Sequence, residues 1–312
     1  MILLCLNILR KTHLLFFLLL SIFTSFFISN TLVVSAEDND IHLVLDTKNI
    51  NNLPNNFRTT SDLERLKNLS NINMKGLDTL NISGSQQFSP NNLSLLVTSI
   101  KTTLPITIVD LRQESHGFIN EYPVSWKGEK NDANLGLTRT EVIDTERKLL
   151  NSITLGTPIQ FFNDPKLTVI PEKVLSENQL VKANSMDYVR IPVTDGKLPT
   201  YEMVDFFVQY VNSIPKDSWL HFHCKEGIGR TTTFMIMYDI MKNYNNATLD
   251  EIINRQLALS GIKEKSILSF PSKERLDFFT KFYEYVKEQN NDFKISWSQW
   301  LNKNNFPLIT IR

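Results

Sequence analysis

The stretch His223-Cys224-Lys225-Glu226-Gly227-Ile228-Gly229-Arg230-Thr231 places a cysteine and an arginine six positions apart, with two glycines between them. The apolar run Trp219-Leu220-His221-Phe222 before it predicts a short buried strand, and residues 232–241 predict a helix. In a strand, tight loop and helix, the N–H groups of the loop converge at a helix N-terminus, where unpaired donors and the helix dipole favour an anion. Gly227 and Gly229 are expected to provide positive φ values and close backbone approach.

The residues of this loop point to phosphoryl transfer through a covalent cysteinyl-phosphate. An anion-binding field stabilises the thiolate of Cys224, which is the nucleophilic form. Arg230 offers a planar fork of donors to two phosphate oxygens. Thr231 starts the helix, and its hydroxyl is placed to donate to the sulfur. The other phosphate contacts are expected from the loop itself, which comprises Lys225, Glu226, Gly227, Ile228 and Gly229.

Other interpretations explain less of the pattern. If Cys224 were only a small core side chain, the two glycines and Arg230 would be accidents. A Walker-type nucleotide loop needs a Gly-Lys-Ser/Thr sequence, which is missing. His221 and His223 share one face of the predicted strand, but no third soft ligand lies nearby in sequence, so no metal site is predicted.

The leaving group needs a proton, so a carboxylic acid should face the loop from elsewhere. Asp195 is the candidate, because it follows the predicted strand 188–193 in a polar loop with Gly196. Water would then attack the cysteinyl-phosphate with the same carboxylate as base. Spacing alone favours Asp195 only modestly over its competitors Asp110, Glu114 and Glu226. Because Cys224, Arg230 and Asp195 are all present, we favour an enzyme over a phosphate-binding module without activity.

Residues 1–36 have the features of a cleaved export signal. Two basic residues and a histidine precede the apolar segment 14–28, and Val34-Ser35-Ala36 ends on small residues before an acidic stretch. The competing interpretation is a retained membrane anchor. Cleavage predicts a secreted, periplasmic or cell-surface protein without stable membrane insertion. Since Cys5 leaves with the signal, Cys224 would be the one thiol of the mature chain.

Residues 37–312 predict a single α/β domain. Removing Arg10 and Lys11 reduces the 33 basic side chains to 31 against 33 acidic ones, and a net charge of −2 argues against a nucleic-acid partner. Alternating strands and helices predict a central, mostly parallel sheet flanked by helices, with the loop at the carboxyl end of a central strand. Residues 114–136 are predicted as loop, and Ser83-Gly84-Ser85 as a break. Short strands at about 40–60 and 155–182 predict a small β-subdomain. The other predicted strands are 106–109, 188–193 and 219–222, and the predicted helices are 90–100, 140–153, 199–212, 232–241, 249–259 and 271–288.

The wider chain resembles the protein-tyrosine-phosphatase-like inositol polyphosphate phosphatases, the bacterial cysteine phytases of the cysteine-dependent phosphatase superfamily. The loop signature His-Cys-x-x-Gly-x-Gly-Arg-Thr is typical of the superfamily, and the block 110–117 narrows it to this branch. Further matching pieces are Phe57-Arg58, Val124-Ser125-Trp126, Asn134-Leu135-Gly136, Arg190-Ile191, Thr194-Asp195, Pro199-Thr200, residues 219–232 and Trp297.

The resemblance implies a protein-tyrosine-phosphatase-like core with a small partial β-barrel and no metal or other cofactor. It implies Cys224 as nucleophile, Asp195 as general acid and Arg230 as phosphate clamp, with Arg58 and Lys197 added as substrate contacts. Inositol polyphosphates such as phytate are the expected substrates. The alternative is a protein-tyrosine phosphatase acting on phosphoproteins.

Three positions depart from the family pattern. Gly196 stands where a histidine commonly follows the general acid, and Leu137 stands where the family has lysine. The segment that contacts the inositol ring is shortened to residues 261–272, which leaves Lys263 and Lys265 as stand-ins. Each missing cation removes charge-assisted contacts to the peripheral phosphates of a substrate.

Overall fold

The computed structural model describes residues 41–306, apart from residues 68, 70, 129–132, 262–269 and 291. These residues belong to one compact unit that begins at residue 40. The predicted signal segment 1–36, Lys263 and Lys265 lie outside the described residues. Among the described helices, none combines the length and apolar character needed to cross a membrane.

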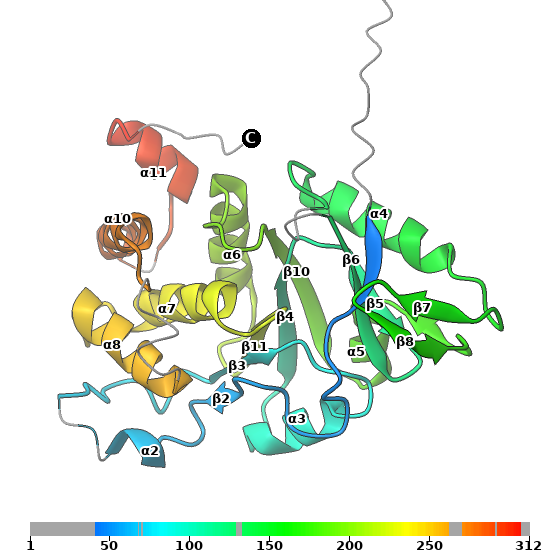
Figure 1. Ribbon diagram of the computed structural model, residues 1–312. Coiled ribbons are helices and arrows are strands. Elements are labelled where there is room, and N and C mark those ends of the chain that lie inside the picture. The colour runs from blue at the N-terminus through cyan, green and yellow to red at the C-terminus, as the bar shows by residue number, and fades with distance from the viewer. Residues whose placement is uncertain are drawn as a thin grey trace, which may run out of the picture. The chain divides into compact units, whose positions relative to one another are not determined.

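A five-stranded sheet forms the centre of the molecule (Figure 1). Its strand order is β10-β4-β11-β3-β2, and every neighbouring pair is parallel except β2 with β3. The predicted α/β class with a central, mostly parallel sheet is therefore confirmed. The strands are β2 (Arg58–Thr59), β3 (Ile82–Gln86), β4 (Ile106–Arg112), β10 (Asp187–Val193) and β11 (Trp219–Cys224).

Helices cover both faces of this sheet. Figure 1 shows α6, α7, α8, α10 and α11 on one side, and α3 and α5 with a smaller sheet on the other. A capping box of Thr248 and Glu251 starts α8, because the Thr248 hydroxyl accepts from the Glu251 amide at 3.3 Å. The helices are α2 (Glu64–Lys67), α3 (Leu93–Ile100), α4 (Arg139–Asn151), α5 (Glu177–Ala183), α6 (Tyr201–Ser213), α7 (Gly229–Asn243), α8 (Leu249–Ser260), α10 (Lys273–Gln289) and α11 (Trp297–Lys303).

Side chains of β11 alternate between two different environments. Leu220 and Phe222 belong to the large apolar core beneath α6, α7, α8 and α10. His221 and His223 point to the opposite face, where His223 packs edge-on against Phe88 with ring centroids 5.3 Å apart. Because successive strand residues face opposite sides, Cys224 follows the core-facing set and lies at the carboxyl end of the strand.

The prediction of a break at Ser83-Gly84-Ser85 is wrong. These residues form the centre of β3, which is buried throughout and pairs in parallel with β11. The sequence of this strand has no alternation of apolar and polar residues that would predict a strand. Its small residues instead allow close packing against α7. A Cβ atom on Gly84 would lie 2.8 Å from both the Met235 sulfur and the Thr231 methyl group, so only glycine lets α7 approach this strand.

The prediction of loop over residues 114–136 is also wrong for its first half. A hairpin of β5 (His116–Ile119) and β6 (Tyr122–Lys127) forms the middle of a four-stranded sheet, with order β1-β6-β5-β9. The flanking strands β1 (His42–Leu45) and β9 (Val174–Leu175) come from the two segments expected to form the β-subdomain. The separate hairpin of β7 (Ile159–Phe161) and β8 (Asp164–Val169) packs against them.

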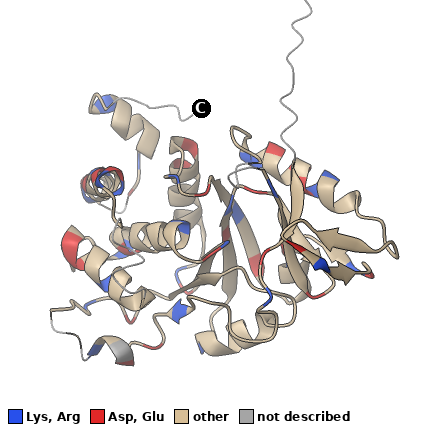
Figure 2. Ribbon diagram, in the orientation of Figure 1, with Lys and Arg blue, Asp and Glu red and all other residues tan. Residues whose placement is uncertain are grey.

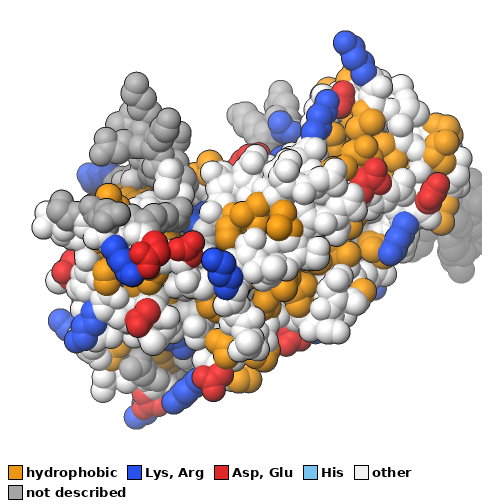
Figure 3. Space-filling view, turned by 90° about the horizontal axis from the view of Figure 1, so that it is seen from below, with side chains coloured by type: hydrophobic (Ala, Val, Ile, Leu, Met, Phe, Trp, Pro, Cys, Tyr) orange, Lys and Arg blue, Asp and Glu red, His pale blue; other side chains and the backbone are white. Residues whose placement is uncertain are grey.

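Charges are mixed on the surface. On the described part of the face in Figure 3, basic and acidic side chains lie near each other among uncharged and hydrophobic ones. That distribution agrees with a formal net charge of zero for the full sequence.

A buried ion pair between Arg255 and Asp239 joins α7 to α8, and its removal should destabilise the fold. Arg255 Nε donates to Asp239 Oδ2 at 2.7 Å, and the guanidinium also reaches the backbone of Lys75 at 3.0 Å. We expect Arg255→Met to lower the free energy of unfolding by about 3–5 kcal/mol, because it leaves the Asp239 charge buried without its partner. Urea unfolding followed by circular dichroism measures the change.

The matched control for this prediction is Arg147→Met, which breaks an exposed ion pair with Asp144 on α4. It should cost at most about 1 kcal/mol. Equal losses in the two variants would contradict the assignment of Arg255.

Candidate active site

The loop after β11 closes around the sulfur of Cys224. Gly227 N and Thr231 Oγ1 each donate to the sulfur at 3.3 Å. Gly227 has φ +73°, and a Cβ atom there would lie 2.3 Å from the backbone of Ser85 and Gln86. The loop therefore needs glycine at this position for its conformation and for its contact with β3. Gly229 differs from expectation: it has no positive φ and is the first residue of α7.

Arg58 lies against the outer side of the loop. Its Nη1 donates to Gly227 O at 2.8 Å, and its Nη2 donates to Thr232 Oγ1 at 3.0 Å. The residue is only 2% exposed. The sequence predicted a substrate contact for Arg58, but the structure places its guanidinium among backbone and side-chain atoms that support the loop.

Arg230 is held by a carboxylate from another strand end. Its Nη1 donates to Glu114 Oε2 at 2.8 Å and its Nη2 to Glu114 Oε1 at 3.2 Å, just beyond β4. Burial disfavours the charged guanidinium, but the charges of Glu114 and Cys224 outweigh it and raise the pKa of Arg230 above its ordinary value. A further bond from Nη1 to Val193 O, at 3.0 Å, ties the arginine to β10.

Asp195 is the one of the four predicted acid candidates that lies at the rim of the loop. Its Oδ1 is 3.2 Å from Arg230 Nη2, and its side chain is 44% exposed. Asp110 and Glu114 are fully buried in ion pairs, and Glu226 is exposed, with its backbone oxygen bonded to Asn56 at 2.8 Å. The geometry therefore favours Asp195 among these carboxylates.

The loop of Asp195 is attached to α7 by a residue that the sequence analysis missed. Arg275, in the first turn of α10, donates from Nη2 to Gly196 O at 3.2 Å and from Nη1 to Thr233 Oγ1 at 2.8 Å. No local motif marks Arg275, because its partners are 79 and 42 residues away in the chain. Lys197 is exposed in the same loop.

Comparisons with known proteins agree with this geometry. The family model for PTP-like phytase, described by the words inositol hexakisphosphate, matches residues 139–242. A PTP-like phytase structure from Bdellovibrio bacteriovorus is 33% identical, with a TM-score of 0.70, and the alignment covers 84% of this chain and 95% of that one. The chain belongs to the PTP-like phytase family.

Two longer proteins are also similar to this chain. A PTP-like myo-inositol phosphatase from Mitsuokella multacida, solved with myo-inositol-(1,3,4,5)-tetrakisphosphate, is 34% identical with a TM-score of 0.75, over 85% of this chain and 48% of that one. The effector protein hopD2 of Pseudomonas syringae pv. tomato is 32% identical over 79% of this chain and 56% of its own length. The chain thus spans about half the length of these relatives. The protein-tyrosine-phosphatase-like character predicted for the fold is confirmed by the solved relatives.

A buried network of charges lies on the face of the central sheet that carries His223. Figure 2 shows residues of both signs along the strands in the middle of the ribbon. His223 Nε2 lies 2.6 Å from Glu177 Oε1, and Arg190 Nη1 lies 3.1 Å from Asp110 Oδ2. His116 lies between them, with Nε2 at 3.2 Å from Asp110 and 3.3 Å from Glu177. The sequence analysis did not foresee this network.

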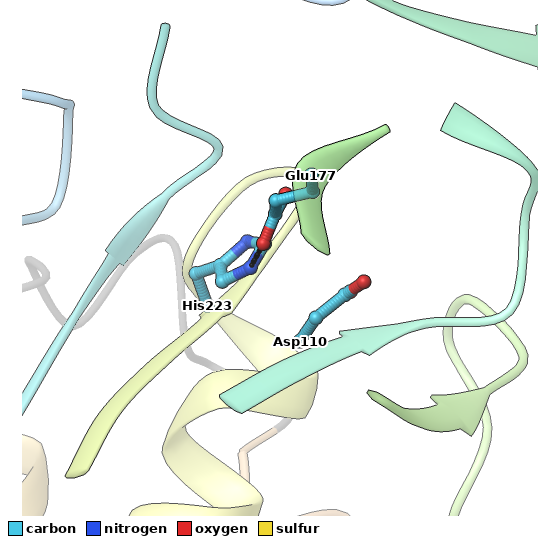
Figure 4. Close-up of side chains that lie close together, drawn as sticks. All are labelled: Asp110, Glu177 and His223. Atoms are coloured by element: carbon cyan, nitrogen blue, oxygen red, sulfur yellow. Dashed lines mark hydrogen bonds and ion pairs between the residues drawn. The ribbon is translucent and has the colours of Figure 1, made fainter. Parts of the chain in front are cut away.

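Asp110, Glu177 and His223 could geometrically surround a metal ion, since their ligand atoms lie within 4.8 Å of one another (Figure 4). Their oxygen atoms are already paired, however. Besides His223, Glu177 accepts from Gln87 at 2.7 Å, and Asp110 accepts from Tyr188 at 2.6 Å. The Arg190 guanidinium beside them would repel a cation, so the cluster fits an ion-pair network better than a metal site.

The protonation of His116 should make the stability of the folded protein depend on pH. Burial disfavours its charged form, but Asp110 and Glu146 outweigh burial and raise the pKa of His116 to about 9, against an ordinary value of 6.5. A raised pKa stabilises the folded state fully below pH 6.5, and this contribution is lost as pH rises through 9. We expect the loss to be on the order of 3 kcal/mol.

Urea unfolding at pH 6 and pH 10 measures this effect in the wild type and in His116→Gln. The variant should lose less stability than the wild type over this interval. The same dependence on pH in both proteins would exclude His116 as its source.

Proposed function

We propose that this chain is a cysteine-dependent phosphatase that hydrolyses phosphate monoesters of inositol polyphosphates through a cysteinyl-phosphate. The observation that carries the proposal is the arrangement around Cys224. Its sulfur accepts two hydrogen bonds from the loop, and Arg230 is held by Glu114 with Asp195 3.2 Å from it. The proposed nucleophile, anion-binding loop and proton donor thus lie together beyond the carboxyl ends of β10 and β11.

In the first step, the Cys224 thiolate attacks phosphorus and the ester oxygen leaves. The two donors to the sulfur, Gly227 N and Thr231 Oγ1, favour the ionised nucleophile. Arg230 and the loop amides stabilise the negative charge on the equatorial phosphoryl oxygens. Protonated Asp195 gives its proton to the leaving oxygen, so the products are an alcohol and the cysteinyl-phosphate.

In the second step, water attacks the cysteinyl-phosphate. Asp195, now a carboxylate, takes a proton from this water, and the P–S bond breaks. Inorganic phosphate leaves, the Cys224 thiolate returns, and Asp195 is again protonated. Cys224, Arg230 and Asp195 together thus account for both steps of the proposed reaction.

Inositol polyphosphates are the proposed substrates because of family membership and because a similar Mitsuokella phosphatase was solved with an inositol tetrakisphosphate. Lys197, in the loop of Asp195, and Arg275, which bonds to that loop, supply positive charge for peripheral phosphates. Export of the mature chain, to the cell surface, the periplasm or the medium, is part of the proposal and is supported by the signal-like residues 1–36.

Replacing the nucleophile tests the mechanism. We expect Cys224→Ser to reduce phosphate release from inositol hexakisphosphate by at least about a thousandfold, because the hydroxyl is not ionised at neutral pH. Substrate affinity, measured by calorimetry, should persist. Substantial turnover by this variant would rule out the covalent intermediate.

Replacing the proposed acid tests proton transfer. We expect Asp195→Asn to slow hydrolysis of alkyl phosphates by about 10²–10⁴-fold and of aryl phosphates with good leaving groups much less. The control is Asp187→Asn, an exposed aspartate at the other end of β10 that pairs with Lys182. Equal slowing for both kinds of leaving group would assign the acid to another residue.

A direct comparison of substrates tests the specificity. The ratio of kcat/KM for inositol hexakisphosphate to that for a phosphotyrosine peptide should exceed one, because Lys197 and Arg275 add contacts to several phosphates. A ratio well below one would identify a protein-tyrosine phosphatase with the same nucleophile and acid.

A further inference from the structure

A chain of alternating charges connects the two ends of the phosphate-binding loop. From Arg230, it passes through Glu114 at 2.8 Å to Arg112, whose Nε is 2.9 Å from Glu114 Oε1. Arg112 Nη1 then donates to Asp46 Oδ2 at 2.6 Å. Asp46 Oδ1 lies 3.3 Å from Lys225 Nζ, which brings the chain back to the residue after Cys224.

Asp46 is the member of this series of ion pairs that comes from outside the central sheet. It follows β1 directly, and its amide donates to Pro123 O at 2.9 Å, which continues the pairing of β1 with β6. Ser125, on β6, donates its hydroxyl to Asp46 Oδ1 at 2.6 Å. The carboxylate is therefore fixed by two strands of the small sheet, and its side chain is completely buried.

The negative charge of Asp46 balances the neighbouring positive charges of Arg112 and Lys225. Burial alone would raise the pKa of Asp46, but Arg112 and Lys225 outweigh it and lower the pKa to about 2, so the group is ionised at neutral pH. Along the chain, two carboxylates face three cations. Without the charge of Asp46, the buried Arg112 would compete with Arg230 for Glu114, and Lys225 would lose its buried partner.

We propose that Asp46 is a positioning residue through which the small sheet sets the phosphate-binding loop, directly by way of Lys225 and indirectly by way of Arg112 and Glu114. The residue touches neither the sulfur nor, in the proposed reaction, the substrate. Its effect is on the placement of Lys225 and Arg230 at the two ends of the loop. This inference rests on the proposed phosphatase function for its kinetic test, and on phosphate binding alone for its second test.

The test variant is Asp46→Asn, which keeps the size of the side chain and removes its charge. We expect kcat to fall about three- to thirtyfold and the affinity for inorganic phosphate, measured by calorimetry, to fall at least about threefold. The matched control is Asp164→Asn, which removes a carboxylate of the β7–β8 hairpin that pairs with Lys48 at 2.6 Å and does not reach the loop. The control should keep kcat and phosphate affinity within about twofold.

A second variant keeps the test decisive if Asp46→Asn does not fold. Ser125→Ala leaves every charge in place and removes the hydrogen bond that orients Asp46, so we expect a smaller fall, about two- to threefold, in kcat and phosphate affinity. Wild-type values for kcat and phosphate affinity in a folded Asp46→Asn variant, or in Ser125→Ala when the first variant is unfolded, would overturn the inference and leave the phosphatase proposal intact.

Failure of the proposed function has a different signature. If the wild-type protein releases no phosphate from inositol hexakisphosphate or an aryl phosphate, the phosphatase proposal fails. The comparison of phosphate affinity among the wild type, Asp46→Asn and Asp164→Asn then still decides whether Asp46 positions the loop.

Discussion

The ion pair between Glu114 and Arg230 is the constraint on which the site depends. A guanidinium that is 2% exposed cannot remain without a carboxylate partner, and Glu114 reaches it with both oxygens. Glu114 lies just beyond β4, and Arg230 lies in the first turn of α7, which follows the neighbouring parallel strand β11. Their pairing therefore fixes the first turn of α7 against the adjacent strand end, and it orients the fork of Arg230 before any phosphate arrives.

The alternation of β11 explains why such charges can be buried at all. One face of this strand packs on the apolar core, and the opposite face carries His221 and His223 toward the small sheet. Burial and the neighbouring His223 lower the pKa of His221 well below its usual range, so the ring is neutral between Ser83 and Ser85. The charged groups of the network around His223 lie on this face, and the small sheet supplies Asp46 to the neighbouring ion pairs.

Sequence reasoning found the elements that have strong local signals. These elements are the loop around Cys224, the strand before it and the helices that start at Thr200 and Thr248. They could be predicted because glycine positions, apolar periodicity and residues that cap helices are local features of the sequence. Sequence reasoning missed β3, whose Ser-Gly-Ser centre has no apolar pattern, and the β5–β6 hairpin, whose buried His116 and Ser125 have partners in distant segments of the chain. The partners of Arg58 and Arg275 could not be predicted, because their contacts join segments distant in the chain.

The small side chains at the centre of β3 limit the substitutions that this strand can accept. A Cβ atom on Gly84 would lie 2.8 Å from the Met235 sulfur and from the Thr231 methyl group, so α7 packs closely against the backbone of β3. One added methyl group would force Met235, Thr231 or α7 itself to shift, and a shift of Thr231 would change the hydrogen bond from its hydroxyl to the sulfur. A substitution at this buried position, which lies outside the loop, would therefore alter the surroundings of Cys224 by way of α7.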